Sequence, residues 1–268
     1  MKKRNWYLRL GVVITLAVAV FTLVGMFYTP YDATQMSSAD KYAPPSLSHL
    51  FGCDQMGRDI FSRTLEGIGT TVTIALATLA IGFLAGLVIG ALCGYYGGLI
   101  DEIVMRICDA VTAFPSTHLA IVVIAVIGSG KYNVIAALGI LFIPSFARLV
   151  RSEFIKYRDR DFVNMAKLTG VPPLRIIFVH ILPNTWPVLL SGLTIGFNNA
   201  VLAEASMSYL GIGVTPPDAS LGRMLSEAQG YLFTAPWYTV FPGLVVILLI
   251  LGVGMIGEGI RERIGEKV

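Results

Sequence analysis

The chain has 268 residues, of which 55% are hydrophobic and only 14% are charged, and its mean hydropathy is +0.72. Soluble globular proteins carry about 25% charged residues, so this composition excludes a soluble protein and indicates an integral membrane protein. The formal net charge of +3 is small, and the three cysteines, Cys53, Cys93 and Cys108, have no metal-binding spacing and support no disulfide framework.

Six apolar segments are long enough to cross a bilayer, since a spanning helix needs about 17 to 25 mainly apolar residues. We therefore predict an all-α membrane protein with six transmembrane helices. The predicted spans are residues 10–28, 71–93, 103–127, 134–150, 184–210 and 237–257. Cations precede the first span, as in a signal peptide. Its apolar core is already long enough to span, so we predict an uncleaved anchor.

The distribution of cations predicts the orientation of these spans. An even number of spans places both termini on one side of the membrane. With the termini inside, fifteen of the 20 lysines and arginines lie on the inner side and five on the outer side. Because cytoplasmic segments carry an excess of cations, we predict cytoplasmic termini. The outer side then has two sizeable loops, 29–70 and 211–236.

Four glycines recur at every fourth residue in the second predicted span. They are Gly82, Gly86, Gly90 and Gly94. In a helix this spacing places them along one face, where the missing side chains let a neighbouring membrane helix approach closely. The row therefore predicts a helix-packing surface. The alternative interpretation is a face that moves or that lines a path.

A long, strongly basic segment separates the fourth and fifth predicted spans. Its cations are Arg148, Arg151, Lys156, Arg158, Arg160, Lys167 and Arg175. The positive-inside bias places this segment in the cytoplasm. Within it we predict a short helix over residues 161–169. Phe162, Met165 and Leu168 recur there at intervals of three residues and form an apolar anchor for a partner.

Polar residues at or within the predicted spans are candidates for function, because such residues are costly in a bilayer. Glu204 and Ser208 lie near the outer end of the fifth span. They either line a polar translocation path or pair locally with another helix. His118 follows Pro115, Ser116 and Thr117, where it would satisfy backbone groups that a proline break leaves free.

Two glycine-rich sequences look like nucleotide-binding motifs but lack the required context. The segment 128–131 would need Gly at position 125 and Ser or Thr at position 132, where Ala125 and Tyr132 stand. The segment 252–257 lies at the end of an apolar span with no strand before it. We therefore predict that the chain is not an enzyme and has no cofactor, and that a partner must hydrolyse ATP if the chain uses nucleotide energy.

The basic segment contains three elements in order: Asn164-Met165-Ala166, then Gly170, then His180-Ile181-Leu182-Pro183. The segment resembles the cytoplasmic coupling loop of ABC importer permeases, whose pattern is Glu-Ala-Ala, three residues, Gly, nine residues, Ile-x-Leu-Pro. The leading Glu and Ala are replaced here, and His stands where Ile is usual. The resemblance implies that the following residues couple the chain to an ATPase: Asp161, Phe162, Asn164, Met165, Ala166, Lys167, Leu168, Gly170, His180 and Pro183.

Two further motifs on the predicted outer side resemble those of permeases in the peptide/nickel group. The first is an external signature before the second span, formed by Gly52, Asp54, Gly57, Arg58, Asp59 and Arg63, with Cys53 in place of the usual Thr. The second runs from Met207 to Gly222 and includes Pro216-Pro217. The three ordered motifs cover roughly residues 50–258.

The resemblance implies a type I ABC importer permease fold and the second, C-type permease subunit of a heterodimer in a prokaryotic cell membrane. The implied partners are a second permease, two ABC ATPases and an extracellular or periplasmic solute-binding protein, without nucleic acid. Small peptides are the favoured solutes, with nickel or a metal chelate as the alternative. We expect residues 1–69 to form the anchor and external loop, 70–258 the core permease domain, and 259–268 a cytoplasmic tail.

Two other classes of protein fit the sequence less well. An intramembrane hydrolase would use His118 with Ser116 or Ser145, but the sequence has no Gly-x-Ser-x-Gly elbow and no paired metal ligands. An ion-driven secondary transporter would show inverted repeats and broken helices rich in ionisable groups, and neither is evident.

Overall fold

The computed structural model describes residues 6–265, and the described chain is helical apart from loops and one isolated β-bridge between Cys53 and Asp59. Lys2, Lys3, Arg4 and Lys267, which contribute to the predicted charge bias, lie outside the described residues. The helices are α1 (Trp6–Phe27), α2 (Ile60–Tyr96), α3 (Gly98–Thr112), α4 (Ser116–Ile127), α5 (Lys131–Arg158), α6 (Asp161–Leu168), α7 (Pro173–Arg175), α8 (Leu182–Tyr209), α9 (Leu221–Ala228) and α10 (Trp237–Gly265). A π-helical turn, η1 (Ile176–Ile181), precedes α8, and a 3-10 turn, η2 (Gln229–Tyr231), follows α9.

Five described helices are long and apolar enough to cross a membrane: α1, α2, α5, α8 and α10. The α8 span is counted from Pro173, because α7 and η1 continue into it. The all-α prediction is confirmed. The prediction of one continuous third span over residues 103–127 is wrong, because α3 and α4 meet at an angle of 84°. Pro115 precedes α4 with extended backbone, and a proline both lacks an amide hydrogen and disfavours helix in the residue before it. The bent pair supplies a sixth span if it is counted as one.

Helix α2 begins at Ile60, well before the predicted start at Thr71. The reason is an N-terminal cap: one carboxylate oxygen of Asp59 accepts hydrogen bonds of 2.7 Å from both the amide and the hydroxyl of Ser62. Such a cap satisfies amides that have no partner inside the helix. The apolar pattern alone could not place this start, because the first turns of α2 carry Arg63 and Glu66.

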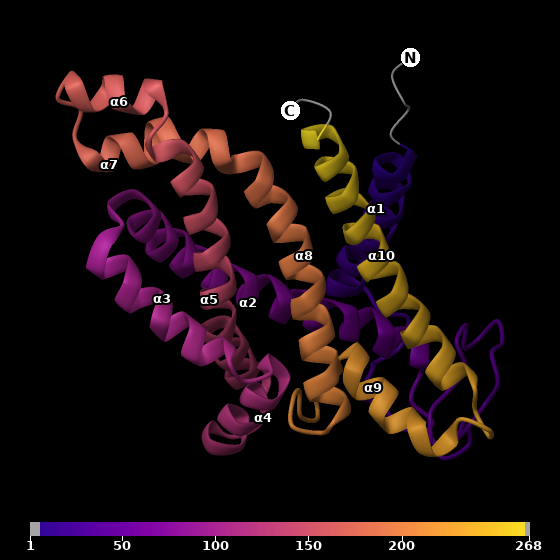
Figure 1. Cartoon of the computed structure of the whole chain (residues 1–268). Helices are drawn as coiled ribbons and strands as arrows, with labels where there is room; N and C mark the ends of the chain where they lie inside the picture. The colour runs from indigo at the N-terminus through magenta and orange to yellow at the C-terminus, as the bar shows by residue number, and fades with distance from the viewer. Residues whose placement is uncertain (1–5, 266–268) are drawn as a thin grey trace.

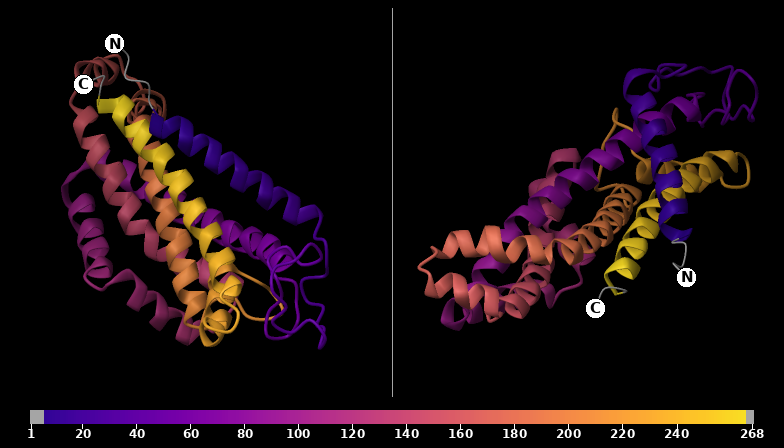
Figure 2. Two further views of the ribbon diagram at one scale, coloured as in Figure 1. Left: turned by 90° about the vertical axis from the view of Figure 1, so that its right-hand side faces the viewer. Right: turned by 90° about the horizontal axis from the view of Figure 1, so that it is seen from above.

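Helices α2, α5 and α8 cross one another in the centre of the molecule, and α1 lies alongside α10 (Figures 1 and 2). Both ends of the described chain lie at the same end of the molecule as α6. The loop before α2, the segment between α8 and α9, and α9 itself lie at the opposite end (Figure 1). This arrangement places the predicted inner and outer segments at opposite ends. Which end faces the cytoplasm stays a prediction from the charge bias.

The four-glycine row of α2, Gly82, Gly86, Gly90 and Gly94, faces α5 at very short distance. A Cβ added at Gly86 would lie 2.6 Å from the Cβ of Phe146 and 2.9 Å from the amide nitrogen of Ala147. Distances this short leave no room for a methyl group without moving α5. The glycines therefore set the separation of the two helices.

Candidate functional site

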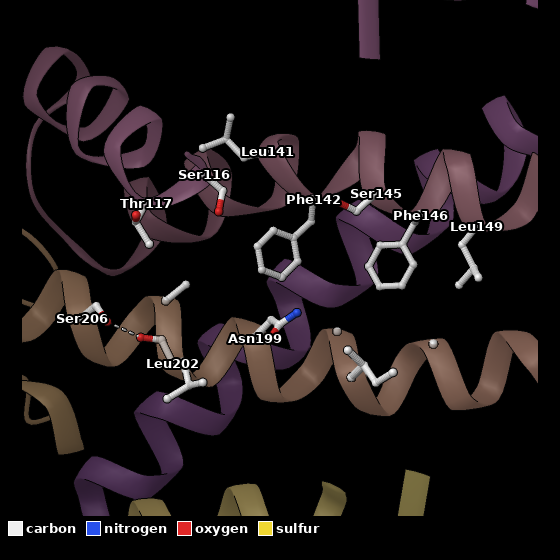
Figure 3. A pocket seen from close by; sticks show the side chains of 14 residues that line it. Ser116, Thr117, Leu141, Phe142, Ser145, Phe146, Leu149, Asn199, Leu202 and Ser206 are labelled. Carbon is white, nitrogen blue, oxygen red and sulfur yellow. Dashed lines mark hydrogen bonds between the residues drawn. The ribbon is translucent and has the colours of Figure 1, made fainter. Parts of the chain in front are cut away.

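A cavity of about 530 Å³ lies between α5, α8 and the break that separates α3 from α4 (Figure 3). Its lining comes from three parts of the chain: Ser116 and Thr117 at the break; Leu141, Phe142, Ser145, Phe146 and Leu149 on α5; and Gly192, Ile195, Gly196, Asn199, Leu202, Ala203 and Ser206 on α8. A smaller cavity of about 220 Å³ adjoins it and shares Ser116, Leu141 and Ser145. The break between α3 and α4 therefore borders both cavities.

The polar groups of this cavity are hydroxyls and one amide. Figure 3 shows Asn199 projecting from α8 into the space between α8 and α5, while the Ser206 hydroxyl bonds back to the carbonyl of Leu202 at 2.7 Å. Exposed polar side chains on membrane-spanning helices face a water-filled space or a partner rather than lipid. The surface between α5 and α8 is therefore the best candidate for a solute path.

Asn199 and Ser206 were not among the polar span residues that we predicted from the sequence. The signal that was available is periodic: the lining residues of α8 recur three or four positions apart from Gly192 to Ser206, as residues on one helical face do. This face differs from the bulky apolar faces of α8, because it carries two glycines, an alanine, an asparagine and a serine.

The predicted path residues Glu204 and Ser208 lie away from this cavity. Both are buried, and the Ser208 hydroxyl donates a hydrogen bond of 2.7 Å to the Glu204 carboxylate. The amide of Val214 donates to the same hydroxyl at 3.1 Å, and the hydroxyls of Thr71 and Ser220 lie beside the carboxyl group. Of the two interpretations left open by the sequence, this geometry favours local pairing.

His118 is exposed on α4 and lines neither of the two cavities. Ser116 and Ser145 each line both cavities. The structure therefore does not assemble the His–Ser pair that a hydrolase would need. Proton transfer requires the two side chains within hydrogen-bond reach.

Helix α6 presents an apolar outer face at the end of the molecule that also holds the termini (Figure 1). Phe162, Met165 and Leu168 are 42%, 60% and 82% exposed. Gly170 has a φ of +76°, the left-handed conformation that commonly ends a helix and that other residues adopt only with strain. Lys167 fixes α6 to the end of α5 by donating a hydrogen bond of 3.0 Å to the carbonyl of Arg158.

The opposite face of α6 is buried. Val163 and Ala166 enter a core cluster with residues of α2, α5, η1 and α8: Phe83, Ala91, Phe146, Val150, Phe154, Ile176, Ile177, Ile181 and Leu189. Phe146 also lines the cavity. A continuous body of close-packed side chains therefore links α6 to the cavity wall. Such interiors are dense and transmit displacement.

His180 and Pro183 lie where η1 passes into α8. The amide of Leu182 bonds to the carbonyl of Ile177 in the wide π-helical pattern, and the proline that follows has no amide hydrogen to donate. The Asn184 side chain donates a hydrogen bond of 2.6 Å to the His180 carbonyl. These residues hold the turn beneath α6. The sequence did not predict the π-helical turn.

A charge cluster ties the external signature to α9 and to the start of α10, at the same end of the molecule. We use this name for Asp54, Arg58, Arg63, Glu227 and Tyr238. Asp54 is fully buried and accepts hydrogen bonds from Arg58 at 2.7 Å and from Arg63 at 2.6 Å. Glu227 on α9 accepts from Arg58 at 3.1 Å, from Arg63 at 3.0 Å and from the Tyr238 hydroxyl at 2.8 Å.

The remaining signature residues shape the loop around this cluster. Gly52 and Gly57 have φ angles of +74° and +73°, and a Cβ at Gly57 would collide with the carbonyl of Ser37. Asp59 caps α2 with one carboxylate oxygen, and its other carboxylate oxygen lies 2.9 Å from Nδ1 of His49. The signature predicted from the sequence therefore folds as one unit. Its partners Glu227 and Tyr238 were not predicted from the sequence.

Glu227 and Cys53, both at this end of the molecule, have shifted pKa values. Burial alone would raise the pKa of Glu227, but the Arg63 guanidinium and hydrogen bonds from Tyr238, Arg63 and Arg223 outweigh it and lower the pKa to about 2. Burial, reinforced by nearby carboxylates, raises the pKa of the Cys53 thiol to about 12. Glu227 is therefore ionised at neutral pH, and Cys53 is an unreactive thiol.

A family model described as "Binding-protein-dependent transport system inner membrane component" matches residues 86–266. The dipeptide transport system permease protein DppC of Alkalihalophilus pseudofirmus is 35% identical over 266 residues, which cover 99% of this chain and 88% of the relative. The glutathione transport system permease protein GsiD of Escherichia coli O157:H7 is 39% identical over 260 residues, which cover 97% and 85%.

A solved structure described as inward-facing conformations of the MetNI methionine ABC transporter has a similar fold. The TM-score is 0.63 at 19% sequence identity, and the match covers 75% of this chain and 95% of that chain. At this level of identity the likeness concerns the fold alone. It agrees with the type I importer permease fold that the motifs implied.

Proposed function

The chain belongs to the family of binding-protein-dependent transport system inner membrane components, and from this premise we propose that it is the permease subunit of an ATP-driven importer of small peptides. Its relatives are named for dipeptide and glutathione transport, and both solutes are short peptides. These names favour peptides over the nickel or metal chelate that the motifs left open. Membership of the family also implies a solute-binding protein and an ATPase as partners.

The observation that carries this proposal is the double-sided packing of α6. One face exposes Phe162, Met165 and Leu168 for a partner, while the other buries Val163 in the cluster that includes Phe146. A push on the exposed face therefore acts on the cavity wall through packed side chains. Rigid-body rotation of such a unit is a common way to convert partner movement into opening and closing.

In the proposed mechanism the ATPases hold ATP, and this chain binds no cofactor. Helix α6 lies in a groove of one ATPase, with the basic residues around it setting its orientation. Closure of the two ATPases moves α6, the end of α5 and η1 together. This movement separates or closes the walls that α5 and α8 contribute to the path.

A second permease subunit would cover the open side of the cavity, so that two chains enclose the path. The cavity reaches the surface between α5 and α8, and exposed polar residues there need water or a partner. An external binding protein would dock at the opposite end, on the loop before α2 and the segment from α8 to α10. The charge cluster holds these two docking segments together.

Reconstitution tests the proposal. The chain would be purified with its second permease, two ATPases and binding protein, placed in proteoliposomes, and assayed with radiolabelled Ala-Ala. We expect uptake that requires ATP and the binding protein, and no comparable uptake of Ni²⁺. Uptake of Ni²⁺ instead of dipeptide would overturn the proposed solute, and uptake without ATP would overturn the proposed mechanism.

A further inference from the structure

Two arginines of α5 face aspartates of α3 in different ways. Arg151 closes a two-pronged ion pair: its Nε donates to one carboxylate oxygen of Asp101, and its Nη2 donates to the other at 2.5 Å. Arg148, three residues earlier, uses only Nη1, which donates to Asp109 at 3.3 Å and to the Thr112 hydroxyl at 3.0 Å. Among the described residues, the structure gives the rest of the Arg148 guanidinium no partner.

The two pairs also differ in exposure. The side chain of Asp101 is 13% exposed, whereas that of Asp109 is 67% exposed and that of Arg148 is 43% exposed. A long, exposed ion pair contributes little stability. The Arg148 pair is therefore open to exchange of its carboxylate, while the Arg151 pair is a closed structural link between α3 and α5.

Arg148 lies next to the two cavities, although its own side chain lines neither of them. Its partner Thr112 lines the smaller cavity, and Ser145, one helical turn away on α5, lines both cavities. Leu149, the next residue, lines the larger cavity. Among the residues that line the larger cavity in the described chain, none is charged. Arg148 therefore places a positive charge beside an uncharged lining.

We propose that Arg148 is a carboxylate-binding position of the translocation path, at which the carboxylate of the solute displaces Asp109. This inference rests on the proposed function, because a small peptide carries a free terminal carboxylate. A guanidinium presents its N–H donors as a planar fork that matches a carboxylate. In Arg148, the donors other than Nη1 can form this fork with a second carboxylate. Exchange between Asp109 and the solute keeps the guanidinium paired throughout and so avoids a stranded charge in the path.

The test uses a reporter thiol in the assembled complex. Cys53, Cys93 and Cys108 are buried, and Ser145 is exposed to both cavities, so Ser145→Cys supplies the reactive thiol. The rate of its labelling by a small maleimide is measured in resting complex with increasing Ala-Ala, or with Ala-Ala carrying a C-terminal amide. We expect Ala-Ala to protect the thiol and the amide to protect it much less.

Substitutions then separate carboxylate binding from a structural role. Arg148→Gln should raise the half-protecting concentration of Ala-Ala at least about tenfold, since it removes a charge-assisted hydrogen bond. Asp109→Asn removes the competing carboxylate and should lower that concentration. A purely structural ion pair would make both variants shift in the same direction. Arg106→Gln is the matched control, because Arg106 pairs with Glu102 on the exposed face of α3 and should change nothing.

The outcomes distinguish this inference from the proposed function. Equal protection by Ala-Ala and its amide, or no protection by either, would overturn the carboxylate position while leaving ATP-dependent peptide uptake intact. A weakening of protection in both Arg148→Gln and Asp109→Asn would overturn it as well. Failure of dipeptide uptake in the unmodified complex would instead contradict the proposed function.

Discussion

Arg63 on α2 donates a hydrogen bond of 3.0 Å to Glu227 on α9, which lies 164 residues later in the chain. The same guanidinium nitrogen bonds to the buried Asp54. This contact joins the external loop before α2 to the segment after α8, the two parts of the chain that we expect to receive a binding protein. It therefore makes the outer end of the permease a single rigid platform.

Loss of Glu227 should destabilise this platform. In Glu227→Ala the Arg63 guanidinium, which is 4% exposed, loses one of its two carboxylate partners. Removing one partner of a buried ion pair costs about 3–5 kcal/mol when the other charge is left unpaired. Arg63 keeps Asp54 as a partner, so we expect a smaller loss that still lowers the unfolding temperature in detergent. Glu102→Ala is the control, because the Glu102–Arg106 pair is exposed and contributes little. Equal unfolding temperatures for the two variants would contradict the prediction.

The low pKa of Glu227 also predicts a pH dependence of stability. The folded pKa is about 2 and the ordinary value is 4.5. The unfolded chain therefore takes up a proton at higher pH than the folded chain. The stabilisation is complete above the ordinary pKa and is lost as pH falls from that value toward the folded pKa. Unfolding temperatures measured through this window should fall more steeply for the unaltered protein than for Glu227→Gln. Parallel curves would show that Glu227 is not responsible.

The glycine row predicts sensitivity to a single methyl group. Gly86→Ala places a Cβ 2.6 Å from the Cβ of Phe146, which overpacks the contact between α2 and α5. Overpacking typically costs about 1–3 kcal/mol, so we expect a lower yield of assembled complex in detergent. The larger Gly86→Leu should be worse.

The control for this prediction is Gly230→Ala, at a site where a Cβ would meet nothing within 4 Å. Its complex yield should match that of the unaltered protein. If Gly86→Ala also assembles normally, α2 and α5 can separate without loss, and the row does not set their distance.

Gly170 should be required for coupling. Gly170→Val forces a β-branched residue into a φ of +76°, although a Cβ there would touch nothing. The left-handed conformation costs about 1–2 kcal/mol for such a residue, so the end of α6 should shift. We expect ATP hydrolysis to persist while peptide uptake falls. Gly98→Val imposes similar strain, at φ +64° and in open space, but at the α2–α3 junction. Equal loss of uptake in both variants would mean that strain in general, rather than the α6 end, is responsible.

Thiol labelling on intact cells tests the predicted orientation. Cys53 is buried within this chain and has a raised pKa, so it cannot serve as the external reporter that its place in the outer loop suggested. Leu47→Cys replaces a side chain that is 99% exposed on the same loop. A membrane-impermeant maleimide should label it on intact cells and should label Met165→Cys only after permeabilisation. The reverse pattern would invert the topology and remove the role of α6 as an ATPase contact.

The sequence by itself determined the class of fold and the existence of α6. Apolar length defines a membrane span, and capping, proline and charge signals act over a few residues, so local pattern was sufficient. The spacing of Gly82, Gly86, Gly90 and Gly94 likewise gave one packing face. The spacing could not identify the helix that packs against this face, because a row of glycines contains no information that points to α5.

Only the tertiary structure decided which polar residues meet. Glu204 and Asn199 lie five residues apart on α8, and the structure buries the first beside α2 and α9 and turns the second toward the cavity. Arg63 bonds to Glu227, and Arg148 bonds to Asp109. The loops between the partners carry no periodic pattern that predicts either contact. Periodicity tells which residues share a face of one helix. Which neighbour covers that face depends on the packing of all the helices together, and a local pattern does not contain this information.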